Sequence, residues 1–142
     1  MLFRSDGAIV EAAKGVKGTA GASNARVLVH AENAANVQAD ASNVYWQSGA
    51  RVFKASKAKG DAVLLAEASG KVADIAIDDS YVYFLTPDAV ARVPKEGGKG
   101  QTYVDNLNTP TSIGVDAQSV YFTTRGTEAN KFKDGTLGKI DK

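Results

Sequence analysis

The chain repeats itself every 38 residues, and this repeat constrains its fold more than any other feature of the sequence. The segment DASNVYW at 40–46 recurs as DDSYVYF at 78–84 and as DAQSVYF at 116–122. A second pattern begins six residues after the aromatic, as VFKASK at 52–57 and VARVPK at 90–95. Because both patterns keep one spacing, a single structural unit is repeated along the chain.

Partial copies extend the repeat to both ends of the sequence. Met1-Leu2-Phe3 corresponds to Val44-Tyr45-Trp46, and the second pattern follows at 9–14 with the same step. Near the other end, 137–142 matches the second pattern once about nine residues are inserted after Phe122. The repeat therefore predicts one domain, 1–142, built from units at approximately 1–36, 37–74, 75–110 and 111–142, of which the first and last are partial.

Each unit contains short segments with the composition of β-strands. Apolar residues alternate, β-branched and aromatic residues are enriched, and turn residues come every 8 to 12 positions. The Ala-rich stretch 31–41 is the best helical candidate, but it contains Asn33 and Asn36 and lacks a large apolar face. The sequence predicts an all-β fold, with strands near 44–48, 50–56, 63–67, 73–78, 82–86, 89–94, 101–105, 111–116 and 119–124.

Four strands in about 40 residues with a fixed aromatic pair are typical of β-propeller blades. The unit Asp-x-x-x-Val-Tyr-Trp/Phe, followed by Val-x-Arg-Val-Pro-Lys-x-Gly-Gly, resembles the YWTD/NHL-like β-propellers, especially the bacterial secreted repeat proteins of that type. The resemblance covers nearly the whole chain and is cleanest at 75–110, with Pro94 and Gly97-Gly98 in place. The copy at 37–74 departs from it, because Ser56 replaces the proline.

The repeat predicts three, four, four and three strands in the successive units, whereas a closed ring of four-stranded blades needs at least about sixteen. We therefore expect an incomplete ring of about 3.5 blades, completed by a protein partner or a second copy. The resemblance implies an extracellular or periplasmic location. The charged start of the sequence, with Arg4 and Asp6, predicts no signal peptide in this chain, and no apolar run is long enough to insert into a membrane.

The repeated residues have structural interpretations and functional alternatives. Each repeated Asp is expected to accept backbone N–H bonds in a turn, the alternative being a Ca²⁺ site. Each aromatic pair is expected in the core between blades, the alternative being a sugar-binding platform. These residues are Asp40, Tyr45, Trp46, Asp78, Tyr83, Phe84, Asp116, Tyr121 and Phe122.

A lysine also recurs at the end of the third strand of each unit. Such a lysine is expected to stay solvated at a sheet edge, the alternative being a binding rim. Truncating the buried Tyr83 to alanine should then cost about 3–5 kcal/mol, and Lys95→Ala should stay within about 0.5 kcal/mol. The lysines are Lys14, Lys57, Lys95 and Lys142.

The insertion at 125–135 is the most individual stretch of the chain. It lengthens one hairpin, carries both signs of charge and contains an aromatic ring. Loops on a rigid scaffold often carry function, so it is the best candidate contact region, the alternative being a mere hairpin extension. The candidate contact residues are Arg125, Glu128, Asn130, Lys131, Phe132, Lys133 and Asp134.

Composition excludes several function classes. The chain has no cysteine, which rules out thiolate catalysis and Cys-based zinc sites, and one histidine, His30, which is not expected to be catalytic. A net charge of +1 with no dense basic cluster argues against nucleic acid as a partner. The sequence favours a non-enzymatic propeller module for binding or assembly, with no cofactor unless Ca²⁺ binds.

Two alternatives remain open. A metal-dependent hydrolase resembling propeller lactonases would need oxygen ligands from the innermost strands, where Asp74 is the only carboxylate. The chain could also be a fragment with no independent function.

Overall fold

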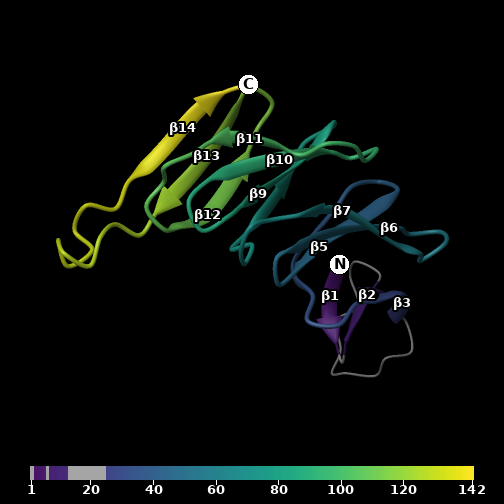
Figure 1. Ribbon diagram of the computed structural model, residues 1–142. Helices are drawn as coiled ribbons and strands as arrows, with labels where there is room; N and C mark the ends of the chain where they lie inside the picture. Colours follow the sequence, from purple (N-terminus) through teal and green to yellow (C-terminus); the bar gives the residue numbers. More distant parts are fainter. Residues whose placement is uncertain (1, 6, 13–24) are drawn as a thin grey trace.

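The computed structural model describes residues 2–5, 7–12 and 25–142 (Figure 1). Every helix or strand in the described residues is a β-strand, and the strands form four antiparallel sheets. We call these sheets blades 1 to 4. Blade 1 contains β1 (Leu2–Ser5), β2 (Ala8–Ala12) and β3 (Ala25–His30). The all-β fold predicted from the sequence is confirmed.

The other three blades follow in chain order. Blade 2 contains β4 (Ala35–Ala39), β5 (Asn43–Ser48), β6 (Arg51–Ser56) and β7 (Ala62–Glu67). Blade 3 contains β8 (Ile75–Ile77), β9 (Tyr81–Leu85), β10 (Val90–Pro94) and β11 (Gln101–Val104). Blade 4 contains β12 (Pro110–Val115), β13 (Ser119–Thr124) and β14 (Leu137–Asp141).

Consecutive strands are neighbours within every blade, so each blade is an antiparallel meander. Consecutive blades meet through their first strands, since β4 contacts β8 and β8 contacts β12. Figure 1 shows blade 1, in purple, and blade 4, in green and yellow, at opposite ends of this arrangement. Within the described residues the four blades form an open stack rather than a closed ring.

The hydrophobic core lies between the blades, in one cluster for each pair of neighbours. Trp46 packs toward blade 1 with Ile9, whereas the adjacent Tyr45 packs toward blade 3 with Val82 and Phe84. Successive residues of a strand point to opposite faces, so the aromatic pairs of blades 2 and 3 each serve two interfaces, whereas in blade 4 only Phe122 packs against a neighbouring blade. Tyr83, Leu85, Val120 and Phe122 form the cluster between blades 3 and 4 in the same way.

The Ala-rich stretch 31–41 contains the strand β4 and no helix. Asn33 and Asn36 have φ angles of 53° and 51°, a left-handed conformation that asparagine tolerates and an α-helix excludes. The side-chain amide of Asn36 donates a hydrogen bond to the Ala73 carbonyl at 2.8 Å. This bond ties the start of blade 2 to the segment that leads into blade 3.

Candidate functional site

Each repeated aspartate begins the turn between the first and second strands of its blade. The Oδ1 atom of Asp40 accepts hydrogen bonds from the backbone N–H groups of Ser42 and Asn43, at 3.0 and 2.9 Å. The same atom of Asp78 and of Asp116 accepts the two corresponding backbone bonds, each at 2.8 Å. One carboxylate oxygen therefore holds the turn in all three blades, as the turn interpretation requires.

The second carboxylate oxygen, Oδ2, accepts a bond from the tyrosine five residues later. The Oη–Oδ2 distance is 2.8 Å for Tyr45 and 3.0 Å for both Tyr83 and Tyr121. The rings of Tyr45 and Tyr83 lie on the faces of their blades that pack against the next blade. The tyrosine thus fixes where Oδ2 points.

A lysine from the following blade completes this arrangement twice. The Lys95 Nζ atom donates to Asp40 Oδ2 at 2.8 Å, and the Lys142 Nζ atom donates to Asp78 Oδ2 at 2.7 Å. The two ammonium groups lie 5.1 and 5.6 Å from the ring centres of Tyr45 and Tyr83. We call each set of three side chains an Asp–Tyr–Lys contact.

The interpretation of these lysines as solvated edge residues is wrong for Lys95 and Lys142. Lys95 is only 6% exposed, and the side chain of Lys142 is also largely covered. The physical reason is that the end of the third strand lies over the aspartate turn of the preceding blade. Lys57 instead lies 4.0 Å from Glu11 of blade 1, and Lys14 is outside the described residues.

The Asp–Tyr–Lys contacts perturb the proton affinities of their members. Burial raises the pKa of Asp78, but the hydrogen bonds from Lys142, the backbone and Tyr83 outweigh it and lower the pKa to about 2. The pKa of Asp40 lies further below its ordinary range because Lys95 and the turn likewise outweigh burial. Burial and the Asp78 carboxylate raise the pKa of Tyr83 to about 12. These shifts keep the aspartates ionised and the tyrosines protonated.

The third aspartate has its turn and its tyrosine but no lysine. Hydrogen bonds from Gln118, Ser119 and Tyr121 lower the pKa of Asp116 and so keep it ionised. In the described part of the chain no cationic side chain forms an ion pair with this carboxylate. Lys142, which pairs with Asp78, reaches Asp116 through the backbone carbonyl and not through the carboxylate. Asp116 Oδ2 is therefore an exposed, preoriented acceptor.

The face of blade 4 that carries Tyr121 points away from blade 3 and is uncovered. In blade 3 the equivalent face is buried beneath blade 4, and it consists of Ala76, Tyr83, Leu85 and Val90. In blade 4 the residue equivalent to Val90 is Leu137, which is 75% exposed. A shallow depression of about 180 Å³ lies on this face, lined by residues 112–114, 121–123 and 137. We call this surface the open face.

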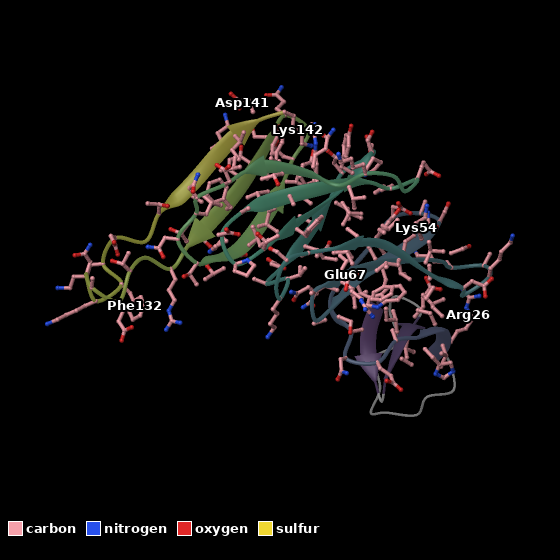
Figure 2. All side chains as sticks on the ribbon, in the orientation of Figure 1. Arg26, Lys54, Glu67, Phe132, Asp141 and Lys142 are labelled. Atoms are coloured by element: carbon pink, nitrogen blue, oxygen red, sulfur yellow. The ribbon has the colours of Figure 1, made fainter. Side chains whose placement is uncertain are left out.

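The loop between β13 and β14 projects away from the sheets, with Phe132 near its tip (Figure 2). Asp134 organises it by accepting bonds from Thr127, through both backbone and hydroxyl, and from the Asn130 amide. These bonds lower the pKa of Asp134 to about 2, the Asn130 amide contributing most. Phe132 is 44% exposed, and the Arg125 guanidinium carbon lies 4.5 Å from its ring centre.

The remaining candidate contact residues lie on the same loop, and all of them are exposed. The Glu128 carbonyl accepts a bond from the Lys131 N–H, and the Asn130 carbonyl accepts one from the Lys133 N–H. The loop therefore has a defined backbone that displays one aromatic ring among three cations. Sequence reasoning located this segment but not its internal hydrogen bonds, which depend on Asp134 folding back over seven residues to Thr127.

The innermost carboxylate, Asp74, is committed to structural bonds. Its Oδ1 accepts the Ile75 N–H at 2.9 Å, and its Oδ2 accepts the Ile113 N–H at 3.0 Å and the Ser112 hydroxyl at 3.2 Å. Asp74 therefore ties blade 3 to blade 4. In residues 2–5, 7–12 and 25–142 no group of three or more His, Cys, Asp or Glu side chains is placed to hold a metal ion. His30 is exposed at the end of β3.

A cleft of about 680 Å³ lies between the outer parts of blades 2 and 3. Glu67, Asp88 and Asp105 contribute carboxylates to its lining. Glu67 forms an ion pair with Arg51 at 3.1 Å, and Asp88 accepts a bond from the Thr86 hydroxyl.

The described residues contain no helix long and apolar enough to cross a membrane.

Comparison with known proteins identifies the fold. No family model and no curated protein sequence matches this chain. Among solved structures, a chain of the crystal structure of a nidogen/laminin complex, a YWTD β-propeller, superimposes with a TM-score of 0.75 at 17% identity. The match covers 99% of this chain and 56% of that chain, so the sequence spans just over half of that neighbour. Our chain therefore has the fold of β-propeller blades.

Proposed function

We propose that this chain is a non-enzymatic assembly module, in which propeller blades bind further propeller blades and so complete a larger ring. The observation that carries the proposal is the open face of blade 4. It repeats the arrangement of the buried face of blade 3, with the tyrosine and the aspartate in place, and it leaves Leu137 exposed. Uncovered blade faces and sheet edges are association surfaces in repeat proteins.

The stack favours assembly because its stability comes from contacts between blades. The three hydrophobic clusters of the described residues each join neighbouring blades. In such an array each unit contacts only its neighbours, and an end unit loses half of its contacts. A partner blade on the open face would restore them.

The loop between β13 and β14 is a second proposed contact with a protein partner. Its ordered backbone presents Phe132 beside Arg125, and aromatic and arginine side chains are enriched where proteins bind one another. This loop lies apart from the open face, so it can contact a partner while the blade stack is complete. The nidogen/laminin structure is itself a protein complex, which is consistent with a binding role.

Sedimentation velocity over a range of concentrations tests the assembly proposal. We expect the chain to self-associate at micromolar concentrations, because a second copy is then available to cover exposed blade faces. Leu137→Lys should weaken this association, since it places a charge on the open face. The matched control is Val63→Lys, because Val63 is a comparably exposed residue on the outer strand of blade 2. A monodisperse monomer of 14.8 kDa at all concentrations would contradict the proposal.

A further inference from the structure

We infer that the open face of blade 4 accepts a further blade of the same repeat, and that Asp116 binds the lysine at the end of that blade's third strand. The inference rests on the proposed assembly function and names the chemistry of the contact. The incoming side chain is a primary ammonium. The incoming surface is the face of a propeller blade that packs against the preceding blade, as the Phe122 face of blade 4 packs against blade 3.

The first argument is that the acceptor is already built. In Asp40 and Asp78, Oδ1 holds the turn and Oδ2 receives both a tyrosine hydroxyl and a lysine ammonium. Asp116 has the same bonds through Oδ1 and the same tyrosine bond through Oδ2. Only the lysine differs, so the carboxylate needs no rearrangement to receive one.

The second argument is that the lysine always comes from the next blade. Asp40 and Lys95 are separated by 55 residues, and Asp78 and Lys142 by 64. The nine extra residues lie in the longer loop between β13 and β14, so the two separations are structurally equivalent. By the same relation, the partner of Asp116 belongs to a blade stacked on blade 4.

The third argument concerns the type of cation. Oδ1 is occupied by two backbone N–H groups, which leaves Oδ2 as a single acceptor beside an aromatic ring. A guanidinium group binds a carboxylate best through both oxygens, whereas an ammonium is a point donor. The site therefore favours lysine over arginine, as in the two contacts already filled.

The shape of the open face adds a requirement on the incoming blade. Gly114 and Thr123 stand where blade 3 has Ala76 and Leu85, and the depression of about 180 Å³ lies at these positions. The side chains that cover blade 3 are those of Ile113, Val120 and Phe122. An incoming blade whose side chains at the positions equivalent to Ile113, Val120 and Phe122 are apolar and at least as large would fill the depression.

An extended chain provides the test. A second copy of residues 96–142 is added after Lys142, which supplies blade 4 with a fourth strand and adds a fifth blade ending in a lysine. Asp116→Asn is then made in the original and the extended chain, because asparagine keeps the turn oxygen and removes the charge. At concentrations where both chains are monomeric, we expect only a small decrease of melting temperature in the original chain, because the substitution there weakens only the turn and tyrosine bonds of Asp116. In the extended chain we expect a decrease on the order of 5 °C, similar to that caused by Asp78→Asn.

Two results would overturn the inference. In one, the extended chain unfolds cooperatively and Asp116→Asn lowers its melting temperature no more than in the original chain. In the other, the added blade stays unfolded while the rest of the chain folds. Replacing the added terminal lysine with methionine supplies the matched variant, because adding Asp116→Asn to it should cause no larger decrease than in the original chain.

Sedimentation of the original chain separates this inference from the proposed function. If Leu137→Lys weakens self-association and Asp116→Asn does not, the open face binds without the lysine contact, which overturns the inference alone. If both variants weaken self-association and the surface control Asp105→Asn does not, the inference is supported. If the chain does not associate at any concentration, the result contradicts the proposed function itself.

Discussion

The two carboxylate oxygens of the repeated aspartate have different partners. Oδ1 closes a turn within one blade, and in Asp40 and Asp78 Oδ2 accepts a bond from a tyrosine of the same blade and one from a lysine of the next blade. Charge-assisted hydrogen bonds of this kind contribute more than neutral ones, and they are costly to leave unpaired when buried. A single short motif therefore fixes both the local turn and the stacking of its blade.

Lys95→Met should destabilise the chain by about 2 kcal/mol, because it removes the cation of a largely buried pair and leaves the Asp40 carboxylate unpaired. Chemical denaturation measures this change. Lys99→Met is the control, since Lys99 is exposed and its substitution should stay within about 0.5 kcal/mol. Equal, small effects of the two substitutions would show that the Asp–Tyr–Lys contact adds no stability.

Stability should fall with pH in the acid range as Asp78 is protonated. Its pKa is about 2 in the folded chain against 3.8 for an ordinary aspartate, so between these values the unfolded chain binds more protons. The stabilisation is present above about pH 4 and is lost as pH falls through about 2. Asp78→Asn should flatten this part of the pH profile of unfolding free energy. Parallel profiles for the two proteins would contradict the account.

The sequence was sufficient to locate the aspartate turns and the aromatic pairs, because both obey rules that are local to one strand or turn. The role of the lysines was not predictable in the same way. Lys95 contacts Asp40 across 55 residues, and this pairing depends on how blades stack. The recurrence of a lysine at the same place in each repeat was the one signal that could have linked it to the aspartate.

Among the elements, β14 shows how one strand is matched to its neighbour. Gly138 pairs with Phe122 of β13, and the Phe122 ring covers the place where a side chain at 138 would lie. Because β14 has no side chain at Gly138, the Phe122 ring of β13 can fill the interface with blade 3. The copy of the repeat in blade 3 has Ala91 paired with Phe84 at this position.

Gly138→Ala should destabilise the chain by about 1–3 kcal/mol, because the new methyl group would force the Phe122 ring to move. Gly114→Ala is the matched control, as a side chain there meets no atom within 4 Å. Thermal unfolding compares the two variants. An equal change of melting temperature in both would contradict the packing described for β13 and β14.

The strand pattern was predictable to within one or two residues for most elements, since alternation and turn residues determine it. The start of β4 and the conformation of the loop at 125–136 were harder to predict from the sequence. β4 begins at Ala35 after a left-handed asparagine, and no simple alternation marks that start. The loop takes its form from Asp134, Thr127 and Asn130, whose contacts depend on the folded backbone.

At the scale of the whole molecule, the described chain is an open stack whose core is shared between neighbouring blades. The inner blades 2 and 3 have covered faces on both sides, while blade 4 has one covered face and one open face. The open arrangement was predictable from the strand count. Which face of blade 4 stays uncovered was not predictable, because its exposure follows from which side of each strand packs inward.

Hydrogen exchange followed by mass spectrometry at low and high protein concentration tests the central claim, that blades bind further blades through exposed faces. We expect peptides from β5, β6, β9 and β10 to be protected at both concentrations, because they lie in blades covered on both sides. Peptides from β12, β13 and β14 should gain protection as concentration rises and the open face is covered. Exchange in blade 4 that stays the same at both concentrations would contradict the account.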